Sequence, residues 1–334
     1  MPSKIDVVVP SFNHWELTQA CLEDLAAQTV EYRVIVSDDG SSDGTPARVR
    51  EAFPDATVVE SERNSGFAVA CNRGVAAGAG TFVVLLNNDV RPRPDFLERL
   101  VAPFERDDRM GSVAALLVRP DEQTIDSVGL AADATFAGFP RLAGLPVSEA
   151  GREQPALAGP SGGAAAYRRA AWEAVGGLDE AIFFYMEDLD LALRLRAAGW
   201  KTAAAPGAVG VHLGSATAGA RSAPMRFNSG FSRAYLLRRY GVLRTRHAPR
   251  AVATEALVAL ADLAFSRDLA AARGRLAGWR AGGPAPRGRP PSDAVEQQID
   301  FVESLRLRWQ DVRGSARRTR ADTPRSSRGP SAPS

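Results

Sequence analysis

The sequence predicts an α/β protein with a mostly parallel, doubly wound sheet, helices on both faces, and further helices toward its C-terminal end. Short apolar segments alternate with segments of helical period over the first half of the chain, which is typical of strand-helix-strand units. Three successive apolar segments end in polar loops, as parallel strands do at one edge of a sheet. Residues 81–91, TFVVLLNNDVR, lack polar alternation before Asn87. Such a run is typical of a central strand buried on both faces.

The elements follow in chain order. Strands are predicted at residues 5–10, 32–37, 57–60, 81–91 and 111–118. Apolar residues at helical spacing predict helices at residues 15–28 and in the segments that carry Val49 and Phe53, Ala70 and Val75, and Phe96 to Phe104. Residues 119–160 are rich in glycine, proline and alanine, and we expect loops and short hairpins over the sheet there.

The remaining elements are mostly helical. We expect regular structure to return at residues 161–167 and to continue into a helix through Trp172. A second helix is expected over residues 187–198, closed by Gly199. Residues 201–213 are expected to form a strand and a loop. Further helices are predicted at residues 227–240, 254–265 and 293–312. The expected organisation is one domain over residues 1–240, a helical extension over 241–312 with a Pro/Gly/Arg linker at 282–292, and a disordered basic tail over 313–334.

Composition is ordinary for a soluble globular protein, with 45% hydrophobic and 24% charged residues among 334. Two cysteines, Cys21 and Cys71, indicate a reducing compartment without structural disulfides. No charged-then-apolar leader follows Met1, and no segment approaches the roughly 20 apolar residues of a membrane span. We therefore expect a cytoplasmic protein. The C-terminal arginines could bind the inner membrane face or, nonspecifically, nucleic acid, but a solvated tail is the preferred interpretation.

Asp89 follows the central strand at the edge where open α/β sheets bind ligands, which makes it a candidate metal ligand. The alternative is structural, because Asn-Asn-Asp before Arg-Pro also ends a strand and opens a turn. From these residues alone the two interpretations have equal weight.

An acidic cluster, Glu187-Asp188-Leu189-Asp190, begins a predicted helix. Carboxylates in a first helical turn are stabilised by the helix dipole, by about 0.3–1 kcal/mol each. Asp190 fits that structural role, with Arg194 four residues on as a surface partner. Asp188 would serve as a general base if the helix start faced the crevice, although spacing alone favours the structural role.

His212 stands between Val211 and Leu213, where a structural and a ligand role are both compatible, the structural one being commoner for a lone histidine. The turn at residues 38–44 and the segment 63–66 could likewise serve only as helix caps. No G-x-G-x-x-G follows the first strand, which argues against a dinucleotide-binding fold, and no Walker lysine is present.

Six motifs occur in order along residues 1–240: VVVPSFN, VIVSDDGSSDGT, RNSGFAVACNRG, LLNNDV, GGLDEAIFFYMEDLDLALRLRAAGW and HLGS. Each is weak alone, but the ordered set resembles the family 2 glycosyltransferases with the GT-A fold, particularly the bacterial rhamnosyltransferase-like branch. The resemblance implies a nucleotide-sugar donor lying across the strand ends. Pro10 and Ser11 would border the nucleotide, Asp39 would bind the base, and the loop from Asn64 to Gly66 would close over it.

The resemblance also assigns the reacting end of the site. Asn87, Asn88 and Asp89 match the family's D-x-D position, with Asp89 holding Mg²⁺ or Mn²⁺ against the diphosphate. His212 matches a second metal contact, and Asp188 matches the catalytic base. The first D-x-D position is Asn87 here, so only one anionic ligand is present. We therefore expect a weaker metal held largely by diphosphate oxygens, with the amides of Asn87 and Asn88 on the donor side.

The function implied by the resemblance is inverting, metal-dependent transfer of a sugar, first of all rhamnose from a dTDP-linked donor, to a glycan or lipid-linked glycan of the cell surface. A UDP-hexose donor is one alternative, and a non-catalytic nucleotide-sugar-binding scaffold is another. The joint presence of Asp89, Asp188 and His212 argues against the scaffold. A nucleotidyltransferase is disfavoured because no basic phosphate loop follows the first strand. Acceptor recognition is expected in residues 119–160 and beyond Phe227.

Overall fold

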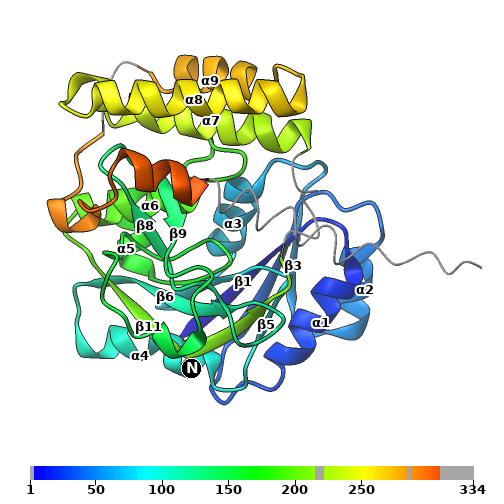
Figure 1. The fold of residues 1–334 in the computed structure, drawn as a ribbon. Helices are drawn as coiled ribbons and strands as arrows, with labels where there is room; N and C mark the ends of the chain where they lie inside the picture. The colour runs from blue at the N-terminus through cyan, green and yellow to red at the C-terminus, as the bar shows by residue number, and fades with distance from the viewer. Residues whose placement is uncertain (1–3, 215–221, 284–286, 309–334) are drawn as a thin grey trace, which may run out of the picture.

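The computed structural model describes residues 4–214, 222–283 and 287–308. One mixed sheet forms the centre, with helices on both of its faces, and a layer of helices from the C-terminal part of the chain lies at the top of Figure 1. The expected tail over residues 313–334 lies outside the described residues. No helix in the described part is long and apolar enough to span a bilayer.

The main sheet has the strand order β3-β2-β1-β4-β10-β6-β11-β5, with β7 paired to β6. Its first part alternates with helices in chain order: β1 (Ile5–Ser11), α1 (Trp15–Leu25), β2 (Arg33–Asp38), α2 (Thr45–Ala52), β3 (Thr57–Glu60), α3 (Phe67–Ala76) and β4 (Phe82–Leu86). These four strands are mutually parallel. The predicted α/β class with helices on both faces is confirmed.

The second part of the sheet mixes directions. It comprises β5 (Val90–Pro92), α4 (Phe96–Arg106), β6 (Met110–Val118), β10 (Ala164–Arg168), α5 (Arg169–Val175), α6 (Glu187–Ala197) and β11 (Lys201–His212). β10 inserts antiparallel between β4 and β6, and β5 runs antiparallel to β11. The predicted single strand over residues 81–91 is therefore wrong in its extent. A turn at Asn87 divides it, and the amide N–H of Val90 donates to the carbonyl of Asn87 at 3.1 Å.

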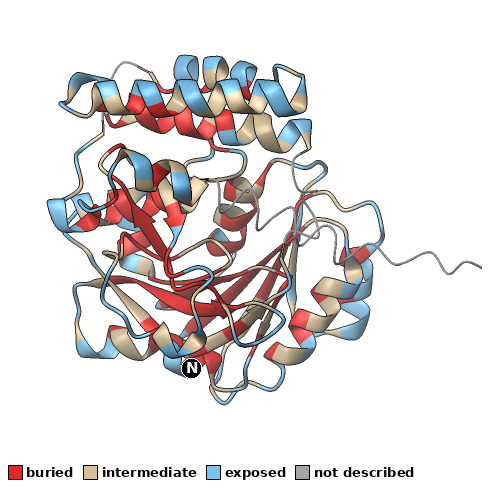
Figure 2. Ribbon diagram, in the orientation of Figure 1, coloured by how far each residue is buried: buried red, intermediate tan, exposed pale blue. Residues whose placement is uncertain are grey.

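The central strands are buried on both faces because their side chains alternate between two apolar clusters. Val7 and Val9 of β1 pack with α1 and α4 on one face, whereas Val8 packs with α3, α5 and α6 on the other. In β4, Val84 and Val83 divide in the same way. The continuous apolar pattern thus predicted two-sided burial correctly, as Figure 2 shows for the whole sheet.

Residues 119–160 form short elements over the sheet, as expected: β7 (Ile125–Ser127), the hairpin of β8 (Leu130–Ala132) and β9 (Gly138–Pro140), and the 3₁₀ turn η1 (Val147–Glu149). Leu130 and Ala132 of β8 pack against Leu189 and Leu193 of α6 and against residues of α7. Helix α6 therefore joins the sheet to the C-terminal helices.

The C-terminal elements are α7 (Ala223–Arg239), η2 (Val242–Arg244), α8 (Ala248–Ser266), α9 (Ala270–Ala281) and η3 (Ser292–Ala294), followed by a helix over residues 301–308. α7 and α9 pack with their backbones close together. A Cβ at Gly274 of α9 would lie 2.0 Å from the carbonyl oxygen of Phe227 in α7, so only glycine fits there. The boundary predicted at residue 240 stays a prediction, and it falls between helices of one packed layer.

The last helix begins later than predicted. Residues 295–300 are not helical, and the helix starts at residue 301. Asp300 ends the irregular segment, since its carboxylate accepts a hydrogen bond from the amide of Glu303 at 2.8 Å, as an N-cap does. Val295 and Ile299 are buried in that irregular segment, so their spacing reflected burial rather than a helix.

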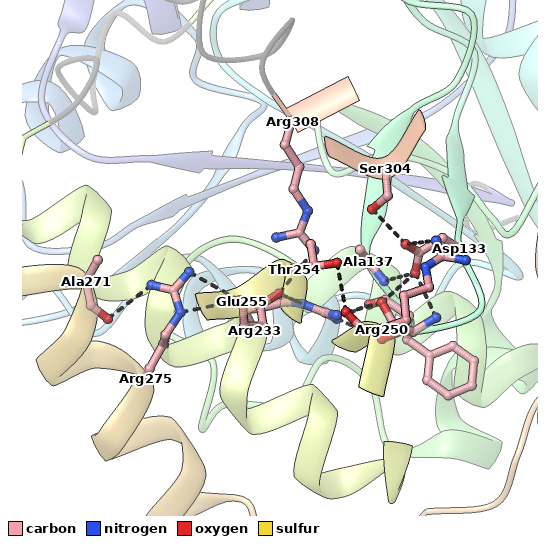
Figure 3. A network of polar contacts seen from close by, with 12 residues as sticks. Asp133, Ala137, Arg233, Arg250, Thr254, Glu255, Ala271, Arg275, Ser304 and Arg308 are labelled. Carbon is pink, nitrogen blue, oxygen red and sulfur yellow. Dashed lines mark hydrogen bonds and ion pairs between the residues drawn. The ribbon is translucent and has the colours of Figure 1, made fainter. Parts of the chain in front are cut away.

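A polar network ties this helix to the rest of the molecule (Figure 3). Asp133, beside the β8–β9 hairpin, is fully buried and accepts hydrogen bonds from Arg250 and Ser304 at 2.8 and 2.9 Å. Glu255 of α8 is ion-paired with three arginines from other segments: Arg233, Arg275 and Arg308. Burial alone would raise the pKa of Glu255, but these three guanidinium groups lower it to about 2. The network is a structural clamp between α7, α8, α9, the hairpin and the last helix.

Candidate active site

The ends of β1, β2 and β4 meet at one edge of the sheet, and the predicted donor-binding residues lie there. Ser11 pairs in register with Asp38, and Val8 of β1 pairs with Leu85 of β4. Pro10 and Ser11 are buried at the end of β1. The Ser11 hydroxyl lies 3.1 Å from the Thr18 hydroxyl. It therefore already has a partner inside the protein.

Two adjacent aspartates after β2 have different partners. Asp38 holds the turn, because its carboxylate accepts the amides of Gly40 and Ser41 at 3.1 and 2.8 Å. Asp39 reaches instead to the next loop, where Oδ2 accepts the amides of Ser65 and Gly66 at 3.0 and 2.8 Å. Its other oxygen, Oδ1, is buried, has Arg73 at 3.5 Å, and accepts no hydrogen bond within the described residues. That oxygen remains available to a ligand.

The loop from Asn64 to Gly66 is held in place at the site. Gly66 has φ of +99°, and a Cβ there would lie 2.7 Å from the carbonyl oxygen of Phe183. The Asn64 side chain accepts the Gly66 amide at 3.2 Å, so it stabilises its own loop. The neighbouring amide of Phe67 donates to the Phe183 carbonyl at 3.0 Å. The donor loop is thus fastened to the segment that precedes α6.

The two asparagines after β4 point in different directions. Asn88 is buried and donates its side-chain amide to Thr18 Oγ1 at 3.0 Å, which directs it toward α1. Asn87 has a buried side-chain oxygen with no hydrogen-bond partner in the described part of the chain. Its backbone amide donates to the carbonyl of Gly163 at 3.0 Å. Asn87 therefore offers a buried oxygen without a partner, whereas the Asn88 amide nitrogen is already bonded.

Asp89 and His212 meet because β5 and β11 pair antiparallel directly beside them. The register places His212 opposite Val90, and the Leu213 amide donates to the Asp89 carbonyl at 3.0 Å. His212 Nε2 lies 3.4 Å from Asp89 Oδ2. Asp89 Oδ1 is buried without a hydrogen-bond partner among the described residues. The structure thus brings the two predicted metal ligands together with ligand atoms to spare.

Asp126 of β7 is a further site residue that the sequence analysis missed. Its Oδ2 lies 2.7 Å from His212 Nδ1, which leaves Nε2 turned toward Asp89. Burial would lower the pKa of His212, but the bonds with Asp126 and Asp89 outweigh it and raise that pKa to about 10. A histidine that binds a metal usually gives its other ring N–H to such a carboxylate. The only sequence signal is a lone acid in an apolar run, IDSVG.

The donor set suits a hard divalent cation that is bound jointly with a substrate. No group of three or more His, Cys, Asp or Glu side chains that could hold a metal occurs in residues 4–214, 222–283 and 287–308. Asp89 and His212 supply two ligands, and the unpartnered oxygens of Asp89 and Asn87 fit a cation or a polar ligand. Mg²⁺ completes such incomplete sets with water and phosphate oxygens.

Asp188 lies in the first turn of α6, after two residues with left-handed backbone. Tyr185 and Met186 have φ of +70° and +67°, a conformation that non-glycine residues seldom adopt outside functional sites. The Asp188 carboxylate accepts the amides of Gly162 and Leu189 at 2.8 and 2.7 Å. Burial raises the pKa of Asp188, and these two N–H donors oppose that rise. Because Gly163 bonds Asn87, the 162–163 backbone links Asp188 to the metal-ligand edge.

Glu187, beside it, is 4% exposed, and its Oε2 has no hydrogen-bond partner within the described residues. Burial and the nearby charge of Asp188 raise the pKa of Glu187 well above its ordinary value. Of the two carboxyl groups, Asp188 has the amide donors that favour the charged form. Glu187 is therefore the member of the pair that holds a proton more readily.

Asp190 is not the surface residue that its spacing to Arg194 predicted. It is fully buried, receives Arg194 Nε at 2.8 Å and the Tyr240 hydroxyl at 3.0 Å, and is also bonded to Arg287. The prediction failed because an i, i+4 pair looks the same on a buried helix as on an exposed one. Asp190 anchors α6 to α7 and to the segment that follows α9.

The family model for glycosyl transferase family 2 matches residues 6–176, just over half of the chain. The chain belongs to glycosyl transferase family 2. The match covers the strand-end site up to α5, and Asp188 and His212 lie beyond it. The rhamnosyltransferase-like resemblance is also confirmed, by a relative in Mycobacterium tuberculosis, an N-acetylglucosaminyl-diphospho-decaprenol L-rhamnosyltransferase, with 31% identity over 201 residues.

That alignment covers 54% of this chain and 66% of the relative, so each chain has a substantial part outside it. A second relative, the succinoglycan biosynthesis protein ExoO of Rhizobium meliloti, is 34% identical over 143 residues, or 41% of this chain and 40% of that protein. By their names, the first relative is a rhamnosyltransferase that acts on a decaprenol-linked sugar, and the second takes part in succinoglycan biosynthesis.

Solved structures share the fold at low sequence identity. The mannosyltransferase PcManGT from Pyrobaculum calidifontis, determined with GDP-Man and Mn²⁺, superimposes with a TM-score of 0.54 at 21% identity, over 96% of this chain and 88% of that one. GalNAc-T7 with UDP, GalNAc and Mn²⁺ gives a TM-score of 0.51 at 16% identity, over 64% and 44%. The predicted GT-A fold is confirmed by these likenesses.

Proposed function

We propose that this chain transfers a sugar from a nucleotide-sugar donor to a hydroxyl of a lipid-linked glycan, with inversion at the sugar carbon and with Mg²⁺ or Mn²⁺. The observation that carries the proposal is the joint placement of Asp89 and His212, with an unpartnered buried oxygen, and of Asp188 on the linked 162–163 backbone. A dTDP-rhamnose donor is the first choice, because the Mycobacterium tuberculosis relative is a rhamnosyltransferase by name.

The chain's own residues supply binding and orientation. The free Oδ1 of Asp39 accepts an N–H of the base, and the loop from Asn64 to Gly66, fastened to Phe183, covers the nucleotide. Asp89 and His212 would hold the metal, with Asp126 fixing the histidine ring. The metal, when bound, neutralises the negative charge that grows on the leaving diphosphate. Asn87 offers its free oxygen to a ribose hydroxyl.

Proton removal falls to Asp188. Its carboxyl group is held by two backbone amides, so it is oriented before the acceptor arrives. As the acceptor hydroxyl attacks the sugar carbon, Asp188 takes the proton and the bond from that carbon to the diphosphate breaks. Attack from the face opposite the leaving group inverts the carbon.

The test is calorimetry of the purified chain against UDP-, dTDP- and GDP-sugars, with and without Mn²⁺. We expect one nucleotide series to bind and to gain affinity with Mn²⁺, and Asp89→Ala to lose that gain. Glu105→Gln, an exposed acid on α4, is the control and should bind as the native chain does. Binding of a UDP-hexose series alone would favour that donor instead. Binding without any transfer would favour the non-catalytic scaffold, and no binding would refute the proposal.

A further inference from the structure

Helices α8 and α9, with the turn between them, carry most of the exposed large hydrophobic side chains of the described chain. Eight of its twelve exposed large hydrophobic side chains lie between residues 248 and 281: Val252, Leu257, Leu260, Leu263, Phe265, Leu269, Leu276 and Trp279. Leu260 is 63% exposed and Phe265 is 66% exposed. Figure 2 shows the outward side of this layer exposed and the side toward the sheet more buried. Apolar surface concentrated in this way marks an interaction site.

Helix α8 is apolar on its outward face because all of its charged residues turn inward. Among 19 residues it has three charges: Arg250 bonds Asp133, Glu255 bonds Arg233, and Asp262 lies 3.5 Å from a nitrogen of Arg226. Only Ala251 and Thr254 of this helix are buried. A helix with this composition is normally enclosed by protein or lipid. Its outward face therefore lacks a covering partner in the described chain.

Exposed arginines accompany this apolar face. Arg267, at the end of α8, and Arg273 and Arg280, on α9, are exposed and have no carboxylate partner among the described residues. The nearby acid Asp268 is already paired with Arg226. On α9, Arg273 and Arg280 share one face with Leu276, at spacings of three and four residues. The outward surface is thus apolar and positively charged at once.

We propose that α8 and α9 form a docking surface for an anionic lipid bilayer, with Leu260, Leu263 and Leu276 entering the headgroup boundary and the arginines contacting lipid phosphates. Interfacial helices combine apolar and basic residues in this way, and they lie in the bilayer plane without crossing it. A second copy of the chain fits less well, because it would bring the same unpaired arginines face to face. Only the purpose of docking, access to a lipid-linked acceptor, rests on the proposed function.

The test is sedimentation of the full chain with vesicles of phosphatidylcholine alone or with phosphatidylglycerol, without donor or acceptor. We expect the native chain to bind the anionic vesicles. The double variant Leu260→Glu, Leu263→Glu should bind them at least about tenfold more weakly. Arg273→Gln with Arg280→Gln should weaken binding about fivefold per arginine at low salt. Two matched controls should bind as the native chain does. One is Val302→Glu, at a 69% exposed position on another helix, and the other is Arg106→Gln on α4.

Circular dichroism of each variant checks that it is folded, since these side chains are exposed. Unchanged vesicle binding by both double variants would overturn the proposal, and would leave the arginine-rich sequence after residue 308 as the membrane contact. A native dimer that becomes a monomer in the Leu260→Glu, Leu263→Glu variant would also overturn it in favour of a second copy. Because vesicle binding needs no nucleotide sugar, its failure is distinct from failure of the proposed transfer reaction.

Discussion

At the strand-end site, buried oxygens of Asp39, Asn87 and Asp89 have no hydrogen-bond donor in the described chain. In the C-terminal network of Figure 3, the buried carboxylates are surrounded by donors instead. Glu255 has three arginine partners, and Asp133 is bonded by Arg250, Ser304 and backbone or side-chain groups of its own loop. Both regions bury acids, but only one of them leaves the acids short of partners.

This difference separates ligand binding from structural support. An unpaired buried polar group is costly, and a bound ligand can supply the missing partner. A carboxylate enclosed by arginines is already neutralised and has no capacity left for a ligand. Burial of acids alone therefore does not mark a site, whereas burial combined with missing partners does.

The largest expected effect comes from Asp188→Asn. It removes the base but keeps the size of the side chain and an oxygen for one of the two backbone amides, so the rate of transfer should fall by about 10²–10⁴-fold. Donor affinity should stay unchanged. Single-turnover transfer and calorimetry measure the two quantities, with Glu173→Gln on α5 as a control that keeps the native rate. Normal transfer by Asp188→Asn would remove Asp188 from the catalytic role.

The network side of the comparison is tested by Glu255→Gln. The variant leaves Arg233, Arg275 and Arg308 without their carboxylate, so the free energy of unfolding at pH 7 should fall by about 3–5 kcal/mol. Because the folded pKa of Glu255 is lowered to about 2, this contribution is complete above its unfolded pKa near 4.5. It disappears as the pH falls from about 4.5 toward 2.

Urea unfolding of both proteins at several pH values measures this contribution. The gap between native chain and variant should close toward pH 2. Glu122→Gln breaks an exposed ion pair with Arg93, at 2.9 Å, and should cost at most about 1 kcal/mol. A small, pH-independent effect of Glu255→Gln would show that the network does not clamp the C-terminal helices.

The same comparison explains what the sequence could and could not predict. The strand ends follow from local patterns, because an apolar run followed by Asn or Asp places those side chains at the sheet edge. Asp89 was therefore a candidate from this pattern alone, whereas the role of Asp39 was implied only by the family resemblance. Asp126 was missed because its partner, His212, is 86 residues away, and only the pairing of β7 with β6 and of β6 with β11 brings the two together.

The network escaped prediction for a related reason. The spacing of Asp190 and Arg194 is typical of an exposed ion pair. The neighbouring sequence gives no sign that Tyr240 and Arg287 bond Asp190. The division of residues 81–91 into β4 and β5 was likewise hidden, because the turn at Asn87 depends on antiparallel pairing with β11. Local pattern predicts elements, whereas burial of polar groups depends on distant partners.

A smaller effect is expected at the missed residue. Asp126→Ala removes the acceptor that orients His212, and a carboxylate bonded to a metal-binding histidine in this way is worth about 10–100-fold in metal affinity. Asp126→Asn keeps an acceptor oxygen and should lie between that variant and the native chain. Mn²⁺ titration in the presence of nucleoside diphosphate measures the effect without turnover. Glu122→Gln, an exposed acid of the same segment, is the control. Native Mn²⁺ affinity in Asp126→Ala would show that Asp126 only supports the fold.

The smallest expected effect concerns Glu187, which is buried like the network acids but has no arginine partner. Its pKa is raised by burial and by Asp188, so the folded chain holds a proton that the unfolded chain releases above about pH 4.5. Stability therefore falls as pH rises from that value toward the folded pKa, with a slope of at most about 1.4 kcal/mol per pH unit.

Glu187→Gln replaces the carboxyl with a permanently neutral group and should remove this slope. We expect urea unfolding between pH 5 and pH 8 to show that the free energy of unfolding of the variant rises relative to that of the native chain as the pH rises. Glu105→Gln, exposed on α4, should have the same pH dependence as the native chain. Parallel curves for native chain and Glu187→Gln would mean that Glu187 is ionised in the folded state. In that case a further hydrogen-bond donor would have to reach its buried Oε2, and the contrast between the site and the network would no longer extend to α6.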